Sequence, residues 1–239
     1  MSQFQDYNLN PALLRAVEEL GFKEPMPIQQ ETLPVLLSQK TDLVGLAQTG
    51  TGKTAAFGLP LLQNIDASQR CIQALVLCPT RELCVQISKD LKNFSKYMPD
   101  VLVVPVYGGA SIEAQFKELA KKPQIIVATP GRLEDMIRRN KVDFTNVKTI
   151  VLDEADEMLD MGFQEDIDRI VAQLPEERQT LFFSATMSTA IRALINRLAS
   201  EPQEISIERP VLTVPTCEQS VYEVVFSSRI EVLSRLIEM

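Results

Sequence analysis

The sequence of 239 residues contains no histidine and only four cysteines. Structural zinc sites are built mainly from cysteine and histidine, and Cys71, Cys78, Cys84 and Cys217 form no Cys-x-x-Cys pair. We therefore do not expect a zinc site. Three of the cysteines stand in apolar surroundings, which favours buried free thiols in a reducing cytosol.

Long apolar stretches are also missing. No run reaches about 18 apolar residues, so we expect no membrane span. Residues 1–6 lack the basic region and apolar run that are typical of a secretory signal. Internal repeats and low-complexity segments are absent from the sequence. With 45% apolar and 23% charged residues, the composition is that of an ordinary globular protein, for which we expect a cytoplasmic location.

The sequence has few positive charges relative to negative ones: 24 lysines and arginines against 32 aspartates and glutamates, which gives a net charge of −8. This balance argues against a protein that binds nucleic acid through bulk positive charge. Any contact with nucleic acid must come from a local surface.

Short apolar runs alternate with longer helical patterns along most of the chain. The runs are continuous in Val, Ile and Leu, as expected of strands buried on both faces of a parallel sheet. The order predicts a doubly wound, mostly parallel α/β sheet of about seven strands flanked by helices. We expect strands at Asp42–Ala47, Ala74–Cys78, Leu102–Tyr107, Gln124–Ala128, Thr149–Leu152, Thr180–Phe183 and Glu204–Ile207. Helices are expected at Pro11–Leu20, Pro27–Leu37, Lys53–Gln63, Arg81–Phe94, Ser111–Lys121, Arg132–Arg139, Phe163–Gln173 and Thr189–Ala199.

The composition changes at Glu208–Thr216, where prolines and polar residues predict a linker. We expect one domain over residues 1–208, a linker over 209–219 and the start of a second domain over 220–239. In this last part, Ser220–Phe226 reads as a strand and Arg229–Glu238 as an amphipathic helix. One strand and one helix cannot bury a core alone. The chain is therefore expected to be part of a longer protein.

A glycine-rich loop follows the first strand and leads into the helix that begins at Lys53. Its glycines let backbone N–H groups turn toward a phosphate, and the helix N-terminus favours negative charge. Lys53 would then reach the β- and γ-phosphates, while the Thr54 hydroxyl would bind Mg²⁺. The alternative is a simple strand-to-helix turn, and the strict pattern asks for Gly where Ala47 stands. The predicted phosphate loop (P-loop) comprises Ala47, Gln48, Thr49, Gly50, Thr51, Gly52, Lys53 and Thr54.

Two further groups of polar residues follow apolar strands. Asp153 and Glu154 come at the end of one strand, where open α/β sheets bind ligands. Asp153 would hold Mg²⁺, partly through water, and Glu154 would orient and deprotonate the attacking water; the alternative is an acidic helix start. Ser184 and Thr186 follow the neighbouring strand, where they are either helix caps or partners of Asp156 that report the nucleotide state.

These motifs resemble those of the DEAD-box RNA helicases. Asp153–Asp156 spells the family signature Asp-Glu-Ala-Asp, and the family's phosphate loop accepts Ala at its first position. Gly21–Gln29 resembles the adenine-sensing Q motif, with Phe4 as its upstream aromatic residue. By this resemblance Gln29 would bind the adenine edge, for which an amide offers both donor and acceptor, and Phe22 would stack on the ring. Met26 stands where Thr is commoner in the family.

Three more segments are similar to the family's RNA-contacting motifs, and each follows an apolar strand. Hydroxyls, backbone N–H groups and arginines at these places can bind phosphates and sugar hydroxyls without reading bases, which a local patch can supply in an acidic protein. The alternatives are helix caps at Thr80 and Thr129 and a turn at the glycine pair. The candidate RNA contacts are Pro79, Thr80, Arg81, Gly108, Gly109, Thr129, Pro130, Gly131 and Arg132.

The resemblance covers about residues 4–207 and implies a RecA-like ATP-binding domain of an ATP-dependent RNA helicase. It implies ATP and Mg²⁺ as cofactors, and RNA and a second RecA-like domain of the same longer protein as partners. Because that domain would supply the arginine fingers, we expect this monomeric part to bind ATP or ADP, to hydrolyse ATP weakly and not to unwind RNA alone. Two alternatives are a nucleotide-gated RNA clamp with little turnover and a P-loop kinase or metabolic ATPase.

Overall fold

The computed structural model describes residues 3–38, 40–207 and 222–237. The chain divides into two units, Met1–Ile207 and Glu208–Met239. The linker expected over 209–219 and Cys217 lie outside the described residues.

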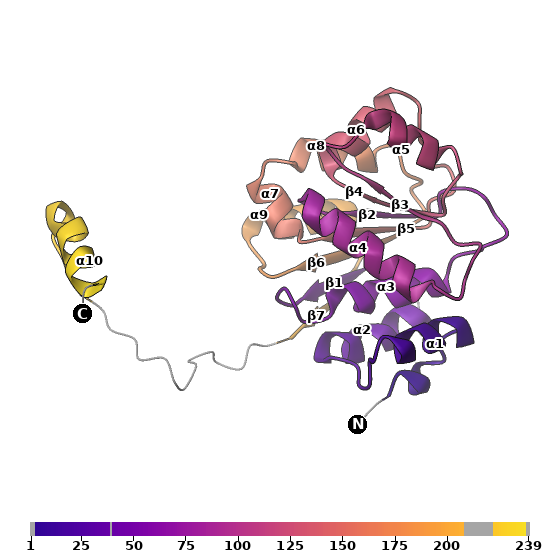
Figure 1. The fold of residues 1–239 in the computed structure, drawn as a ribbon, viewed down its shortest axis with the longest axis horizontal. Helices are drawn as coiled ribbons and strands as arrows, with labels where there is room; N and C mark the ends of the chain where they lie inside the picture. Colours follow the sequence, from indigo (N-terminus) through magenta and orange to yellow (C-terminus); the bar gives the residue numbers. More distant parts are fainter. Residues whose placement is uncertain (1–2, 39, 208–221, 238–239) are drawn as a thin grey trace. The chain divides into compact units, whose positions relative to one another are not determined.

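Seven parallel strands form the sheet of the first unit (Figure 1), in the order β3-β4-β2-β5-β6-β1-β7. This confirms the expected sheet. Pro105, which cannot donate a ladder hydrogen bond, lies in β3 at one edge, where proline is tolerated. The strands are β1 (Leu43–Leu46), β2 (Ala74–Leu77), β3 (Val103–Val106), β4 (Ile125–Ala128), β5 (Thr149–Asp153), β6 (Gln179–Ser184) and β7 (Gln203–Ser206).

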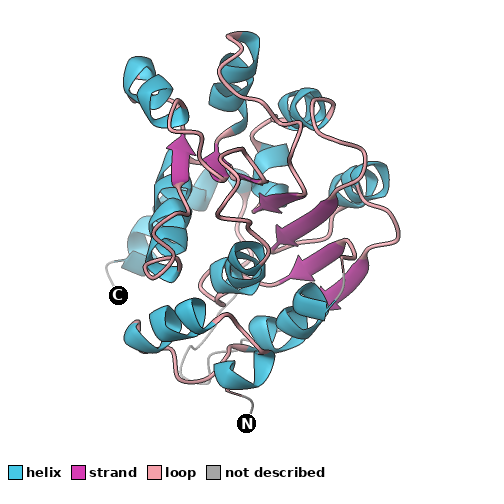
Figure 2. Ribbon diagram, turned by 90° about the vertical axis from the view of Figure 1, so that its right-hand side faces the viewer, coloured by secondary structure: helices cyan, strands magenta, loops and turns pink. Residues whose placement is uncertain are grey.

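Helices cover both faces of the sheet (Figure 2). One face packs against η1 (Phe4–Tyr7), α1 (Pro11–Glu19), α2 (Pro27–Ser38), α3 (Lys53–Gln63) and α4 (Arg81–Phe94). The other face packs against α5 (Ile112–Leu119), α6 (Pro130–Arg138), α7 (Ala155–Asp160), α8 (Gln164–Val171) and α9 (Thr189–Leu198).

Alternate residues of each strand enter two separate cores. In β2, Ala74 and Val76 belong to the core under α1–α4, whereas Leu75 and Leu77 belong to the core under α5–α9. Both sets are buried, which explains why the strand is apolar at every position instead of alternating. This is the pattern on which the sequence-based prediction of a parallel sheet depended.

The structure corrects some of the expected elements. The short helix α7 follows the Asp153–Asp156 segment directly and was not predicted as a helix. Helix α6 begins at Pro130, two residues before its expected start, because proline fits the first helical position. Cys78 and Cys84 are buried free thiols, as expected, while Cys71 is half-buried.

The described part of the second unit contains the 3₁₀ helix η2 (Phe226–Ser228) and the helix α10 (Arg229–Ile237). The strand expected over 220–226 is wrong for residues 222–226, which include no strand. A strand needs a neighbour for its backbone hydrogen bonds, and the described residues of this unit offer none. No helix among residues 3–38, 40–207 and 222–237 is long and apolar enough to cross a membrane.

Candidate functional site

The strand order sorts the candidate residues into two halves of one sheet edge. The glycine-rich loop (residues 47–54), Asp153 and Ser184 follow or end β1, β5 and β6, which are neighbours. The candidate RNA contacts follow β2, β3 and β4, which are also neighbours. Because all strands are parallel, both halves lie at the carboxyl edge, where open α/β sheets bind ligands. We call them the loop half and the arginine half.

The glycine-rich loop connects β1 to α3. Its first residue, Ala47, is buried and donates its backbone N–H to the Ser184 carbonyl at 3.0 Å, so the loop is anchored to β6. Gly52 has φ +86°, and a Cβ there would clash with Nε2 of Gln29. Glycine is therefore required at position 52 both by the backbone conformation and by the close approach of Gln29.

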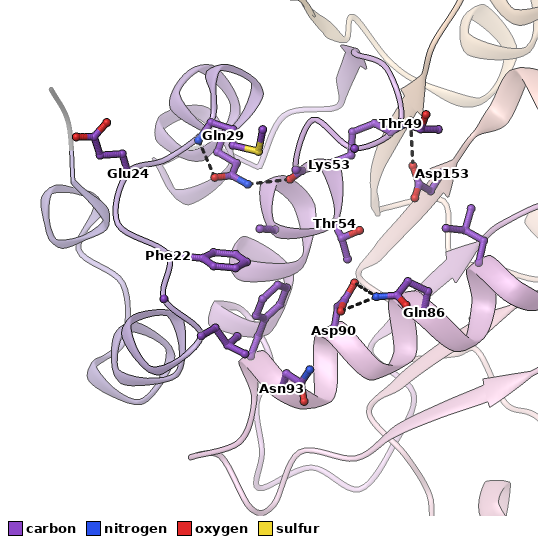
Figure 3. Close-up of a pocket in the computed structure, with 18 of the residues that line it drawn as sticks. Phe22, Glu24, Gln29, Thr49, Lys53, Thr54, Gln86, Asp90, Asn93 and Asp153 are labelled. Atoms are coloured by element: carbon purple, nitrogen blue, oxygen red, sulfur yellow. Dashed lines mark hydrogen bonds and ion pairs between the residues drawn. The ribbon is translucent and has the colours of Figure 1, made fainter.

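A cavity of about 750 Å³ opens beside this loop (Figure 3). Figure 3 shows Phe22 and Gln29 on one side of it and Gln86 and Asp90 of α4 across from them. The volume falls in the range of small-molecule sites. Nine of the predicted ATP-site residues line the cavity: Phe22, Gln29, Thr49, Gly50, Gly52, Lys53, Thr54, Asp153 and Glu154.

An aromatic group forms one wall of the cavity. Phe22 is 38% exposed, and its ring centroid lies 6.1 Å from that of the buried Phe4 and 6.1 Å from that of Phe94. The two rings behind Phe22 hold it in place with one part open to the cavity. An apolar ring in this position can stack on a flat ligand.

Gln29 is buried and joins the Q-motif segment to the glycine-rich loop. Its Oε1 accepts a hydrogen bond from the Met26 backbone N–H at 2.9 Å, and its Nε2 donates to the Gly52 carbonyl at 3.0 Å. Each end of the amide keeps one hydrogen-bonding position beyond these contacts. The amide is thereby fixed in orientation as well as in place.

Lys53 and Asp153 form a buried ion pair in the loop half. The Lys53 Nζ lies 3.9 Å from the Asp153 Oδ1, and both side chains are almost fully buried. The Lys53 Nζ has no hydrogen-bond partner, whereas Asp153 Oδ1 accepts from the Glu154 N–H at 3.1 Å. Burial raises the pKa of Asp153 to about 6, although the Lys53 charge opposes the rise. A buried ammonium with unused donors is well suited to an anionic ligand.

Glu154 adopts a left-handed backbone conformation, with φ 53° and ψ 50°, where β5 turns into α7. Such a conformation is strained for a residue other than glycine and is often found at functional sites. Burial, followed by the neighbouring Asp153 charge, raises the pKa of Glu154. A raised pKa makes the carboxylate a better proton acceptor.

Asp156 forms one of the hydrogen bonds that the sequence suggested, the one to Thr186 after β6. Its Oδ2 accepts from the Thr186 N–H at 3.0 Å and from the Thr186 hydroxyl at 2.8 Å, and the Ser184 hydroxyl donates to the Thr186 carbonyl at 2.8 Å. Burial alone would raise the pKa of Asp156, but the hydrogen bonds that it accepts from Thr186 outweigh burial and lower the pKa. These bonds connect α7 to the end of β6.

Two arginines converge on the loop after β3 in the arginine half. The Arg81 guanidinium lies 5.3 Å from the Tyr107 ring centroid, and a Cβ at Gly109 would lie 3.3 Å from Arg81 Nη1. Arg132 Nη1 donates to the Ala110 carbonyl at 3.3 Å. The loop after β3 therefore has one positive charge on each flank, although the whole chain is acidic.

The other candidate RNA contacts differ in their exposure and in the hydrogen bonds that they form. The Thr80 Oγ1 caps α4 by accepting from the Leu83 N–H at 3.2 Å, whereas Thr129 makes no such bond at the start of α6. Gly108, Gly109 and Gly131 are exposed. Pro79 and Pro130 are buried, so they shape their turns and do not offer a contact surface.

Sequence reasoning missed the wall that α4 contributes to the cavity. Gln86, Asp90 and Asn93 line it, and Gln86 Nε2 donates to both carboxylate oxygens of Asp90, at 2.9 and 3.0 Å. Their spacing of four and three residues places them on one side of the helix, away from the buried Cys84, Ile87 and Leu91. This polar stripe was a signal, but it could not show that the helix borders a ligand site.

The fold and the site define a RecA-like α/β domain. At the carboxyl edge of its sheet, the lysine that ends the glycine-rich loop forms an ion pair with the aspartate that ends β5. The sequence profile described as DEAD/DEAH box helicase matches residues 26–194. The chain belongs to this family.

Relatives and solved structures agree with the family. The chain is 47% identical over 239 residues to the DEAD-box ATP-dependent RNA helicase CshA of Bacillus cereus, covering 100% of this chain and 45% of that protein. It is 48% identical over 235 residues to the ATP-dependent RNA helicase DeaD of Escherichia coli strain K12, covering 98% and 37%. The crystal structure of a DEAD box protein from Methanococcus jannaschii matches with a TM-score of 0.81 and 35% identity, covering 99% and 63%. The chain thus spans less than half the length of these curated relatives.

Proposed function

We propose that this chain is the ATP-binding part of an ATP-dependent RNA helicase, in which RNA-stimulated ATP hydrolysis drives local unwinding of RNA duplexes. One observation carries the proposal: the cavity beside the glycine-rich loop brings together an aromatic ring, a fixed amide, a buried lysine and an acidic pair of which Asp153 is buried. The first two suit adenine, and the last two suit a phosphate chain. The names of the relatives support RNA as the second ligand.

The donor groups fit Mg²⁺. Thr54 and Asp153 offer a hydroxyl and a carboxylate, which are the hard oxygen ligands that Mg²⁺ prefers. Among the described residues no group of three or more acidic, histidine or cysteine side chains could hold a metal alone, in keeping with a cation bound partly through water and phosphate. The cavity is lined by two lysines and by four carboxylates, Glu24, Asp90, Asp153 and Glu154, which leaves a formal charge of −2. A polyphosphate would therefore need a cation here.

In this proposal each residue has a defined task. Lys53 binds the β- and γ-phosphates, and Gln29 and Phe22 hold the adenine. Glu154, with its raised pKa, orients the attacking water and accepts its proton. When bound, Mg²⁺ neutralises charge on the phosphate oxygens. Asp156, Ser184 and Thr186 link this half of the edge to the rest of the domain.

The arginine half is the proposed RNA surface. Arg81 and Arg132 would bind phosphates, and the exposed glycines would let the RNA backbone approach closely. Contacts of this kind need no base recognition, so the RNA sequence would not be read here. The second RecA-like domain would lie in the remainder of the longer protein and supply arginine fingers, worth about 10³–10⁵ in rate where they have been measured. This function supports a cytoplasmic location and a monomeric ATP-binding part.

Nucleotide binding by this chain tests the first part of the proposal. Titration with fluorescent ADP and Mg²⁺ should show saturable binding that Lys53→Ala abolishes, while Lys117→Gln, an exposed substitution on α5, should leave it unchanged. Hydrolysis by the chain should be slow with or without RNA. Robust RNA-stimulated turnover by the chain alone would contradict the need for a second domain.

The full-length protein tests the second part. Its ATPase rate should rise with single-stranded RNA, and Arg81→Gln or Arg132→Gln should reduce this response at least tenfold without changing ADP affinity. Arg138→Gln, on the same helix as Arg132, is the matched control. RNA binding without turnover would instead support a nucleotide-gated clamp. Turnover that is indifferent to RNA would support a metabolic ATPase.

A further inference from the structure

A second cavity, of about 520 Å³, lies at the opposite edge of the sheet. We call it the basal cavity, because Ala74, Thr149 and Gln179, which line it, begin β2, β5 and β6. Since the strands are parallel, their first residues lie at the edge away from the glycine-rich loop and Asp153. The basal cavity is therefore separate from the proposed ATP site.

The floor of the basal cavity is fixed by two buried glutamines. Gln73 accepts from the Asp66 N–H at 2.9 Å and donates to the Asp66 carbonyl at 2.8 Å. Gln179 donates its side-chain N–H to the Thr41 carbonyl at 2.8 Å. With both amides bonded to backbone groups, the cavity keeps its shape without a ligand.

Positive charge gathers around this cavity in an acidic chain. Lys40, Lys148 and Arg178 line it, and none of them forms an ion pair among the described residues. Glu177 is the one carboxylate among the lining residues, so the formal charge of the lining is +2. The basal cavity thus has the opposite sign to the cavity beside the glycine-rich loop.

Arg178 adds a second, independent sign of an anionic ligand. Its Nη1 donates to the Pro175 carbonyl at 2.8 Å, which orients the guanidinium, but its buried Nε has no hydrogen-bond partner. Leaving a buried charged donor unpaired is costly. Among the buried side-chain atoms of the described residues, the other unpaired cationic nitrogen is the Lys53 Nζ in the proposed ATP site.

We propose that the basal cavity binds the phosphate group of a small phosphorylated molecule. The Arg178 guanidinium and the two lysines would hold the phosphate, while Leu61 and Ile65 offer apolar surface to the organic part. The volume suits a ligand of nucleotide size. RNA fits less well, because the lining contains no aromatic residue on which bases could stack.

Side-chain nitrogen NMR of Arg178 gives a direct test. The protein, with its carboxyl-edge site filled by ADP, would be titrated with inorganic phosphate and with uridine monophosphate while the Arg178 Nε–H signal is followed. We expect a saturable shift with both, with a Kd of about 1 mM or below for uridine monophosphate. Tighter binding of the monophosphate than of free phosphate would show that the organic part contributes. Equal binding would show that free phosphate itself is the ligand, and would overturn the phosphorylated-molecule assignment.

Charge-matched variants complete the test. Lys148→Gln should weaken uridine monophosphate binding several-fold, and Lys40→Gln with Lys148→Gln at least tenfold, whereas Lys117→Gln on α5 should not change it. No shift up to about 10 mM ligand would overturn the proposal. An equal loss in Lys117→Gln, or a shift with an oligonucleotide and not with the monophosphate, would do the same. Binding of ADP is measured separately, so the fate of the proposed function does not decide this result.

Discussion

Replacing Asp153 by asparagine should remove a destabilisation of the nucleotide-free protein that grows as the pH rises. Asp153 is 2% exposed, and its burial raises its pKa from 3.8 to about 6. A carboxyl group with a raised pKa binds more protons in the folded than in the unfolded state between these values. The free energy of unfolding therefore falls as the pH rises through this window.

The size of the effect follows from the two pKa values. At pH 5 the folded protein holds most of the proton and the unfolded chain has lost it, whereas at pH 7 both have lost it. By linkage, this one group lowers the free energy of unfolding by about 1 kcal/mol between pH 5 and pH 7. The neighbouring Glu154, whose pKa is also raised, acts in the same direction.

Urea denaturation at pH 5, 6 and 7, in buffer with chelator and without nucleotide, measures this. The unfolding free energy of the wild-type protein minus that of Asp153→Asn should fall by about 1 kcal/mol from pH 5 to pH 7. Asp160→Asn, the same change at an exposed residue of α7, should show the same dependence of unfolding free energy on pH as the wild-type protein. A difference that is flat or rises with pH would refute the assignment of the raised pKa to burial of Asp153. Because Asp153→Asn also leaves the Lys53 ammonium unpaired, only the pH dependence is diagnostic, and not the absolute stability.

Three further substitutions test the geometry of the site. Gly52→Ala should reduce ADP affinity at least tenfold in a fluorescence titration, because the added Cβ would clash with Gln29. Gly50→Ala is the control: Gly50 has a similar φ of +79° but open space around it, so ADP affinity should fall less. Phe22→Leu should weaken ADP binding by about 1 kcal/mol in the same assay, while leaving the urea midpoint nearly unchanged because the ring is partly exposed. Thr186→Val should destabilise the protein by about 1 kcal/mol through loss of the bond to Asp156, and Thr186→Ser should restore it; an unchanged urea midpoint in Thr186→Val would count against that link.

Much of this architecture could be predicted because the signals are local in sequence. Each buried strand is a continuous apolar run, and the motif residues stand directly after such runs, so the fold class and the loop half follow from reading along the chain. The sequence pattern did not predict helix α7, because it has only six residues and begins inside the acidic motif. The described residues 222–226 form no strand because pairing depends on a neighbour, which the sequence pattern cannot supply.

Features that depend on packing between distant segments could not be predicted in this way. The α4 wall borders the cavity because α4 packs beside α3, and the basal cavity combines side chains from five separate stretches of the chain. Lys40, Lys148 and Arg178 look like ordinary surface cations in the sequence. Only the three-dimensional structure shows that they line one cavity and that none of them forms an ion pair within the described part of the chain.

Helix α4 is the element that touches both halves of the functional edge. It begins at Arg81 in the arginine half and ends at Phe94, whose ring packs against Phe22 in the cavity. Its 14 residues span roughly 21 Å at 1.5 Å per residue. Contact at both ends gives proximity, but coupling also requires two arrangements that both ligands bias. Helix α4 packs on α3 and β3, so a shift of the whole helix would move the cavity wall and the end that begins at Arg81 together. If nucleotide and RNA bind as proposed, α4 is a second candidate route of coupling between them, beside the Asp156–Thr186 link.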